Sequence, residues 1–314
     1  MIKMIATLVM ALAMVPANAA NVSFDAPGRS MLPAINNINV PARPALVTEA
    51  VNPFERFSAE KIVGGVQAVK GEFPFIVSLK SSYGSHFCGG SLIKKNWVLT
   101  AAHCVGPAHI KAGIVAQLGA ADISASDGVA VPIERVVRHA RYSPGNIYDY
   151  DVALLRLSRG TAWRPSKVIA KANLGAMPGN PSMLQTTGWG VTKGRGNLPV
   201  AFLRHGVMSL VPPAQCAALP DFGAARLPSG VTTPRVHSRI FCAGARGVRT
   251  CPGDSGGPVF YREFGKPPRV VGVVSWAKRD CGVVSDTRPA VYTRIDQYLG
   301  WIGRAKKAAG STAE

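Results

Sequence analysis

The residues from Gly253 to Pro258, which read GDSGGP, bring a hydroxyl, a carboxylate and three glycines into one short turn. A serine hydroxyl attacks a carbonyl group only when a base removes its proton, and the oxygen anion that develops needs backbone N–H donors. Ser255 supplies the hydroxyl, and the glycine two residues earlier lets the backbone approach a substrate with no Cβ in the way. The turn predicts a nucleophile with its oxyanion site built in, and an ordinary Gly/Pro turn is the alternative.

A histidine should act as the base for this serine, and the chain contains six. His103 is singled out because it lies in LTAAHC, where apolar and small residues precede it and a cysteine that can hold the backbone follows. The third group should be a carboxylate kept from water, and Asp151 begins DVALLRL, an apolar run typical of a buried strand. An ionised aspartate is costly there unless it accepts a hydrogen bond, for which an imidazole N–H is suited.

Alternatives remain for each of these two residues. Taken alone, His103 can be a histidine packed in the core, and Asp151 can be a cap at the start of a strand. Asp149 is a rival carboxylate two residues away. We favour Asp151 because it directly precedes the apolar run, and we expect it to orient the base.

Further motifs accompany these residues, and together they resemble the chymotrypsin/trypsin-like serine proteases from Ile62 to about Ile302. The additional motifs are IVGG at 62–65, CGGSLI at 88–93, GWG at 188–190, FCAG at 241–244, SW at 275–276 and PAVYTRI at 289–295. By this resemblance His103 acts first as a base and then as an acid, and Asp151 orients it. Ser255 attacks the substrate.

The resemblance also implies the oxyanion site and the reaction. The backbone N–H groups of Gly253 and Ser255 are the implied oxyanion hole. The implied activity is that of a serine endopeptidase, which hydrolyses protein or peptide substrates through an acyl-enzyme and needs no cofactor.

The implied fold is all-β, with two antiparallel six-stranded β-barrels at about 62–165 and 166–314, a short C-terminal helix, and the catalytic residues at the seam. The composition agrees, since 33 glycines and 24 prolines among 314 residues suit many short strands joined by turns. The strands expected from apolar runs are Phe75–Leu79, Ser91–Leu99, Val152–Leu157, Val259–Tyr261 and Val270–Ser275. A helix from Gln297 to about Lys307 should turn Tyr298, Trp301 and Ile302 toward the body.

The N-terminal region has the features of an exported precursor. Lys3 is followed by the apolar stretch Met4–Val15 and by the small residues Ala17–Ala19, which predicts a signal peptide at 1–19. The apolar stretch is too short to span a bilayer, so no transmembrane segment is expected, although an uncleaved anchor is the alternative. Residues 20–61 are rich in proline and lack periodicity, as in a poorly structured pro-segment. We expect a secreted protein, extracellular or periplasmic, with the protease domain at 62–314.

Lys61 immediately precedes the IVGG motif. The resemblance implies that cleavage after this lysine frees the α-amino group of Ile62, which then turns inward to the carboxylate of Asp254. A buried carboxylate or ammonium is costly alone, so the turn is organised only after cleavage and the precursor should be nearly inactive. The alternative is that Lys61 is an exposed linker charge.

Six cysteines are present, and six can pair in fifteen ways. The resemblance selects Cys88–Cys104, Cys216–Cys242 and Cys251–Cys281, and disulfides suit an oxidising compartment. Zinc is the competing interpretation, but the sequence has no C-x-x-C pair and no H-x-x-x-H pair. We expect no metal.

The specificity pocket departs from the familiar pattern. By the same resemblance, Arg249, six residues before Ser255, takes the place at the pocket floor where trypsin-like enzymes carry an aspartate. A guanidinium there binds a carboxylate and repels a cation, which predicts cleavage after Asp or Glu. Such an enzyme should not cut after Lys61, so its activation should need another, trypsin-like protease.

Other features of this pocket favour different side chains. The remaining pocket residues implied by the resemblance are Thr250, Ser275, Trp276, Ala277 and Ala290. The two alanines replace glycines and narrow the slot. Asp286 can neutralise Arg249, or the arginine can swing out to solvent, and then small apolar residues would be preferred. Other specificities stay open.

The formal net charge is +19, and almost all of it belongs to the protease domain. Such an excess favours contact with anionic glycans or lipopolysaccharide, although a solvated surface without a partner is the common case. A catalytically weak basic protein that binds anionic surfaces is the alternative function. No motif supports binding of a nucleic acid, and we expect a monomer.

Overall fold

The computed structural model of the chain describes residues 65–124, 127–143, 149–158, 171–177, 183–192, 199–217, 238–244, 248–277 and 289–310. These residues all belong to one compact unit of the chain. The expected signal peptide and pro-segment lie outside the described residues, together with Lys61 and Ile62. Cys281 and Asp286 also lie outside them.

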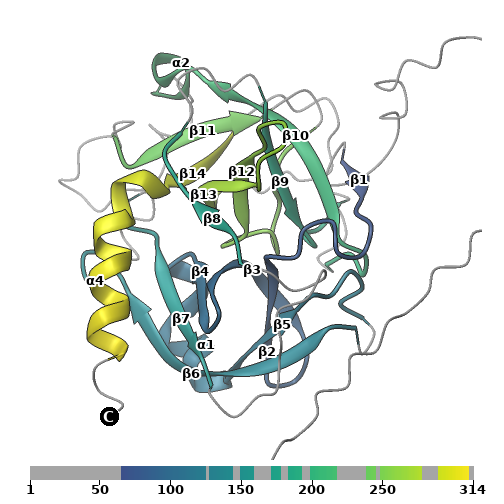
Figure 1. Cartoon of the computed structure of the whole chain (residues 1–314), viewed down its shortest axis with the longest axis vertical. Helices are drawn as coiled ribbons and strands as arrows, with labels where there is room; N and C mark the ends of the chain where they lie inside the picture. Colours follow the sequence, from purple (N-terminus) through teal and green to yellow (C-terminus); the bar gives the residue numbers. More distant parts are fainter. Residues whose placement is uncertain are drawn as a thin grey trace, which may run out of the picture. The chain divides into compact units, whose positions relative to one another are not determined.

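Six antiparallel strands form the first barrel, and they pair in the closed order β2-β3-β4-β7-β6-β5 (Figure 1). Their bounds are Ile76–Ser81 for β2, His86–Lys94 for β3, Trp97–Thr100 for β4, Ile114–Leu118 for β5, Val129–Arg138 for β6 and Ala153–Leu157 for β7. Alternate side chains fill the interior, where Val77, Leu79, Val98 and Leu155 are fully buried. Because the sheet closes on itself, these six strands leave no unpaired edge.

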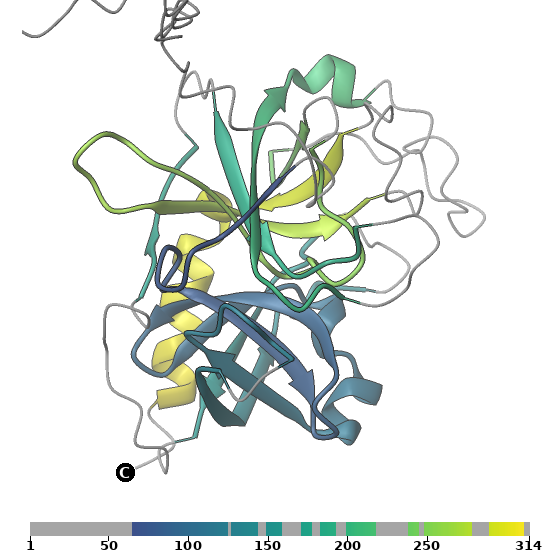
Figure 2. The same cartoon turned by 90° about the vertical axis from the view of Figure 1, so that its right-hand side faces the viewer.

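The second barrel repeats this architecture with the strand order β10-β11-β14-β13-β12-β9 and closes through pairing of β9 with β10. Its strands are Leu184–Gly188 for β9, Arg204–Val211 for β10, Ile240–Gly244 for β11, Pro258–Tyr261 for β12, Arg269–Trp276 for β13 and Ala290–Arg294 for β14. Two short strands pair with the barrel in addition to this closed order, β1 (Val66–Gln67) with β10 and β8 (Asn173–Leu174) parallel to β13. Figure 2 shows the first barrel mainly in blue and the second mainly in green.

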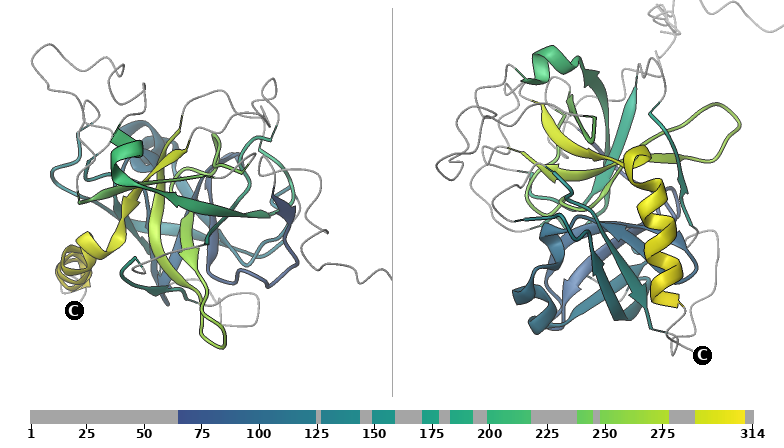
Figure 3. Two further views of the ribbon diagram at one scale, coloured as in Figure 1. Left: turned by 90° about the horizontal axis from the view of Figure 1, so that it is seen from above. Right: turned by 90° about the vertical axis from the view of Figure 1, so that its left-hand side faces the viewer.

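The helices are short except for the one that follows the second barrel. They are η2 (His103–Val105), α1 (Pro107–Ala112), α2 (Pro213–Ala217), η3 (Ile295–Tyr298) and α4 (Leu299–Gly310). Although α4 follows β14, it lies along strands of the first barrel (Figure 3, right). Ile302 and Ala309 join the core of that barrel, and the buried Arg156 of β7 donates a hydrogen bond to the carbonyl oxygen of Ala309. The helix thus fastens one half of the unit to the other.

The fold predicted from the sequence is confirmed: the described residues form an all-β unit of two six-stranded barrels with a C-terminal helix. The inward direction of Tyr298, Trp301 and Ile302 is also confirmed, with Tyr298 and Ile302 buried and Trp301 half-buried. No helix in the described part of the chain has both the length and the apolar character needed to cross a bilayer.

One expected strand was wrong. The segment Ser91–Leu99 is not a single strand, because the chain turns at Lys95 and Asn96 and the two sides pair as the hairpin β3–β4, with Ser91 opposite Leu99. Apolar residues on both sides of a two-residue polar turn made the segment look continuous. The expected division between the barrels near residue 165 lies outside the described residues.

Candidate active site

The pairing of β4 with β7 brings His103 and Asp151 to one end of the first barrel. Thr100, the last residue of β4, pairs with Ala153, the first residue of β7. His103 follows the one by three residues and Asp151 precedes the other by two, so both side chains arise from the same rim. Asp151 Oδ2 accepts a hydrogen bond from His103 Nδ1 at 2.8 Å, and its Oδ1 accepts from the His103 backbone N–H at 2.9 Å.

The second barrel completes the surroundings of Asp151. Ser275 Oγ on β13 donates to Asp151 Oδ2 at 2.6 Å, and Thr293 Oγ1 on β14 donates to the Asp151 carbonyl oxygen at 2.9 Å. The aspartate is only 1% exposed, and these donors offset the cost of burying its charge. Sequence reasoning placed Ser275 in the specificity pocket and missed this bond, for which the only signal was a hydroxyl residue at the end of an apolar strand.

Asp149, the rival carboxylate, has a different partner. It is buried and accepts two hydrogen bonds from Arg239, at 2.6 Å each, from Nε and Nη2. These hydrogen bonds raise the pKa of the Arg239 guanidinium. Of the two aspartates, Asp151 is therefore the one joined to His103.

The turn that carries Ser255 is held by strands of both barrels. The Ser255 carbonyl oxygen accepts from the backbone N–H of Gly89 on β3 at 2.7 Å, and the Gly256 N–H donates to Val274 on β13 at 2.8 Å. Gly256 has a φ of +78°, and a Cβ there would lie 2.2 Å from Thr100 Oγ1. Only a glycine fits this approach, so the turn lies directly against the end of β4 that precedes His103.

Two backbone N–H groups of this turn stand apart from the others. The N–H groups of Asp254, Gly256 and Gly257 all donate to backbone carbonyl oxygens. Those of Gly253 and Ser255 donate to no acceptor within the described residues. Two such donors beside a serine are what an oxyanion hole requires, because they must be available to an oxygen of the substrate.

His86 fixes the peptide group of Gly253, and sequence reasoning missed it. Its Nε2 lies 2.9 Å from the Gly253 carbonyl oxygen and must donate, because that oxygen can only accept. Its Nδ1 then accepts from Ser78 Oγ at 2.8 Å. Burial is the main cause that lowers the pKa of His86 to about 4. The neutral ring therefore links β2 of the first barrel to the turn of the second, and the polar Ser78 inside an apolar strand was the available signal.

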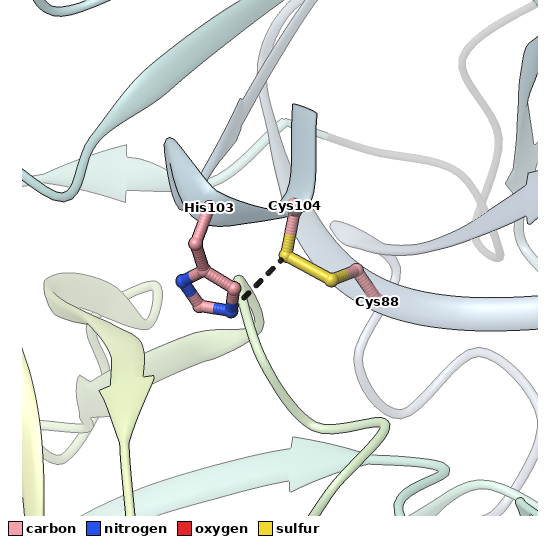
Figure 4. A group of neighbouring side chains, drawn as sticks. All are labelled: Cys88, His103 and Cys104. Atoms are coloured by element: carbon pink, nitrogen blue, oxygen red, sulfur yellow. Dashed lines mark hydrogen bonds between the residues drawn. A yellow bond between two sulfur atoms is a disulfide. The ribbon is translucent and has the colours of Figure 1, made fainter. Parts of the chain in front are cut away.

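His103 Nε2, the atom left after the bond to Asp151, points toward the disulfide beside it. It lies 3.7 Å from Cys104 Sγ (Figure 4). The side chain is 31% exposed, and among the described residues no hydrogen bond joins it to Ser255 Oγ. Hydrogen bonds of this kind are often long in free enzymes and tighten only when a substrate binds.

The structure contains the disulfides Cys88–Cys104, with Cα atoms 6.2 Å apart, and Cys216–Cys242, with Cα atoms 5.7 Å apart. The first ties β3 to η2 next to His103. Cys88, His103 and Cys104 lie close enough together to suggest a metal site, but the two sulfurs are bonded to each other and are not thiolate ligands. The expected partner of Cys251 lies outside the described residues.

Asp254, which directly precedes Ser255 in the turn, is a further buried carboxylate and is 2% exposed. It accepts from the backbone N–H groups of Gly190 at 2.7 Å and Cys251 at 2.9 Å. A Cβ at Gly190 would lie 2.4 Å from this carboxylate, so the GWG motif encloses it. Burial raises the pKa of Asp254 to about 6, and within the described part of the chain no cation pairs with it.

Of the expected pocket residues, Arg249 and Thr250 lie in the segment that leads into the turn, and the others lie on β13, directly after it, or on β14. Arg249 is 3% exposed, so it does not swing out to solvent. Thr250 and Ala290 are buried, whereas Trp276 and Ala277 at the end of β13 are half-buried. Ala290 belongs to an apolar cluster of the second barrel, and Ala277 packs against this cluster.

Comparisons with known proteins agree with this architecture. The family model described as Trypsin matches residues 62–302. The chain is 35% identical over 250 residues to chymotrypsin-like elastase family member 1 of Felis catus, covering 77% of this chain and 88% of the relative. It is 33% identical over 258 residues to the protein of that name from Macaca fascicularis, covering 78% and 89%. Ovochymase of Halocynthia roretzi is 30% identical over 251 residues, which are 78% of this chain and 15% of that longer protein.

Proposed function

Because the chain belongs to the trypsin family of serine proteases and is a serine endopeptidase, we propose that His103, Asp151 and Ser255 perform its chemistry through an acyl-enzyme. One observation carries this proposal: the Asp151–His103 pair lies at the rim against which the Ser255 turn packs, and that turn has two N–H groups that donate to no acceptor among the described residues. This region therefore contains a candidate for each role of the reaction: the nucleophile, the base, the carboxylate that orients the base, and the oxyanion donors.

The hydrogen bond to Asp151 fixes which nitrogen of His103 does the work. With the proton held on Nδ1, Nε2 is the basic atom, and it takes the proton of the Ser255 hydroxyl as Oγ attacks the substrate carbonyl. The N–H groups of Gly253 and Ser255 stabilise the oxyanion. Nε2 then protonates the leaving amine, and a water deprotonated by the same atom hydrolyses the acyl-enzyme.

Replacement of the nucleophile tests this mechanism. Ser255→Ala should lower kcat by about 10⁶-fold with the fold intact, because removing the nucleophile disables all of the acting residues together. Ser85→Ala, which removes an exposed hydroxyl of the β2–β3 turn, is the matched control and should leave kcat unchanged. Peptidase activity retained by the Ser255 variant would end the proposal.

The chain is proposed to be made as an exported precursor, with a signal peptide at 1–19, a pro-segment at 20–61 and the protease domain at 62–314. Cleavage after Lys61 would let the α-amino group of Ile62 pair with Asp254. The support is the state of Asp254, which is buried and accepts from two backbone N–H groups, with no cation paired to it among the described residues. The disulfides support export to an oxidising compartment, extracellular or periplasmic.

For specificity we propose cleavage after Asp or Glu, because Arg249 is a buried cation beside the expected pocket. A second preference, for small apolar residues, is favoured by Ala290 and by Ala277, which packs against the apolar cluster of Ala290, and by the elastase name of the relatives, since elastase has a small pocket. The activating enzyme is then a separate, trypsin-like protease.

A peptide-library profile of the activated chain separates the two preferences. If Arg249 binds an acidic side chain of the substrate, Arg249→Gln should lower the rate of cleavage after Asp and Glu about tenfold or more. Arg249→Lys, which keeps the positive charge, should retain much of this cleavage. If small apolar residues are preferred, both variants should cut after them as the parent does. A preference for Lys or Arg in the parent would contradict both proposals.

A further inference from the structure

A cavity of about 600 Å³ lies apart from the catalytic residues, on the side of the unit covered by α4. Segments far apart in the sequence line it: His139 and Arg141 after β6, Tyr150 before Asp151, Arg239 before β11, and residues of η3 and α4. None of His103, Asp151 and Ser255 lines it.

Aromatic rings form the wall of this cavity. His139 stacks on Tyr150, with ring centroids 4.7 Å apart and an 18° angle between the planes. The same imidazole lies 5.0 Å from the ring of Trp301 and meets Tyr298 edge-on at 5.6 Å. Rings that contact one another in this way hold one another in place, so the wall of the cavity is preformed.

Three guanidinium groups lie around these rings. Arg239 lies over Tyr150 at 4.7 Å and holds Asp149, while Arg141 donates to the Tyr150 hydroxyl at 3.0 Å. Arg304 of α4 is exposed at the cavity. Burial, followed by the charge of Arg141, lowers the pKa of His139, in keeping with a positive environment. Among the residues that the structure describes, these three guanidinium groups and the neighbouring carboxylate of Asp149 leave two positive charges in excess.

We propose that this cavity binds the phosphate monoester group of an organic ligand. Such a group carries nearly two negative charges and three acceptor oxygens, which match the excess charge and the donor geometry of arginine. Since Asp149 already holds Arg239, the phosphate engages Arg141 and Arg304. The half-buried ring of Trp301 receives the organic part.

Calorimetric titration of the full chain with glucose 6-phosphate tests the site without any measurement of catalysis, so its outcome is independent of the proposed peptidase mechanism. Arg304→Ala should weaken the Kd about tenfold, because a charge-assisted hydrogen bond is lost. The matched control is Lys307→Ala, which removes an exposed cation of the same helix outside the cavity and should leave the Kd unchanged. Equal weakening by both variants, or no binding by the parent, would overturn the site.

Two further ligands define what the site reads and where the phosphate comes from. Inorganic phosphate should bind more weakly than glucose 6-phosphate, and equal affinity would contradict the role of the aromatic wall. If the phosphate belongs to a lipid, vesicles of phosphatidylcholine with phosphatidate should bind the parent chain and should not bind the Arg304→Ala variant. If the parent binds glucose 6-phosphate but not these vesicles, the phosphate belongs to a soluble ligand. Thermal melting of each variant verifies that the exposed substitutions leave the fold intact.

Discussion

Asp151 and Asp254 are buried to the same degree, 1% and 2% exposed, yet their surroundings differ. Asp151 receives a ring N–H, a backbone N–H and a hydroxyl on its two oxygens, from both barrels. Asp254 receives two backbone N–H groups and has a raised pKa. One carboxylate is fully supplied by its neighbours in the described chain, whereas the other carries a cost of burial.

The size of that cost explains why the difference matters. A rise in the pKa of Asp254 from 3.8 to about 6 corresponds to about 3 kcal/mol between its two protonation states. A domain is stable by only about 5–15 kcal/mol, so this is a substantial part of its stability. Under the proposed function, Asp151 serves catalysis and Asp254 awaits the α-amino group of Ile62.

The largest expected effect is the loss of kcat when Asp151 is replaced. Asp151→Asn should lower kcat about 10⁴-fold, because an amide can hold His103 with the wrong nitrogen protonated. Asp149→Asn is the matched control, since that carboxylate pairs with Arg239 and not with His103. It should cost less than about tenfold in kcat. If steady-state kinetics show equal losses of kcat in the two variants, Asp151 is not the residue that orients His103.

The next effect concerns stability. In a Lys61→Gln precursor, which cannot be cleaved there, the raised pKa of Asp254 stabilises the fold below pH 4, and this contribution is lost as the pH rises through about 6. The substitution Asp254→Asn, added to this precursor, changes the free energy of unfolding at each pH. This change should be more favourable to the folded state at pH 8 than at pH 4, by about 2–3 kcal/mol. Urea unfolding at both pH values measures this difference. The substitution alters the hydrogen bonds of Asp254 at both pH values, so their contribution cancels when the two changes are subtracted.

The cleaved protein provides the opposite case for Asp254. Once an ammonium group pairs with the carboxylate, the same substitution should lose activity and gain no stability at pH 8. A stabilisation of the cleaved form equal to that of the precursor would show that no cation reaches Asp254.

The smallest effect sharpens the description of Asp151. Ser275→Ala removes a hydroxyl donor to the carboxylate, and kcat should fall about tenfold with KM unchanged. Thr293→Ala removes a bond to the backbone carbonyl oxygen of the same residue and should cost only about fivefold. A larger loss in the Thr293 variant would mean that the position of the backbone, and not the supply of donors to the carboxylate, governs His103.

The parts of this unit that sequence reasoning reached are those written in short segments. The motifs around His103 and Ser255 predict candidate catalytic residues, because each motif gathers its groups within a few positions of the chain. The barrels and the helix followed from the family resemblance, but Ser91–Leu99 was misjudged, since a turn of two polar residues leaves the apolar pattern nearly unbroken.

Partners from distant segments could not be read from the sequence. Arg239, which distinguishes Asp149 from Asp151, lies 90 residues beyond the aspartate it binds. His86 reaches Gly253 across 167 positions, and nothing near either residue signals the other. Such contacts are set by how the barrels close and meet, which local patterns do not encode.

The helix α4 has a consequence for how the chain acquires its structure. The β-barrel that comes first in the polypeptide is finished by side chains synthesised long after its own strands, since Arg156 meets its acceptor on Ala309 153 positions later. Contacts of such long range delay folding. The early half must therefore wait, incompletely packed, for the late half to emerge, and the two are expected to reach their final form in a single concerted step.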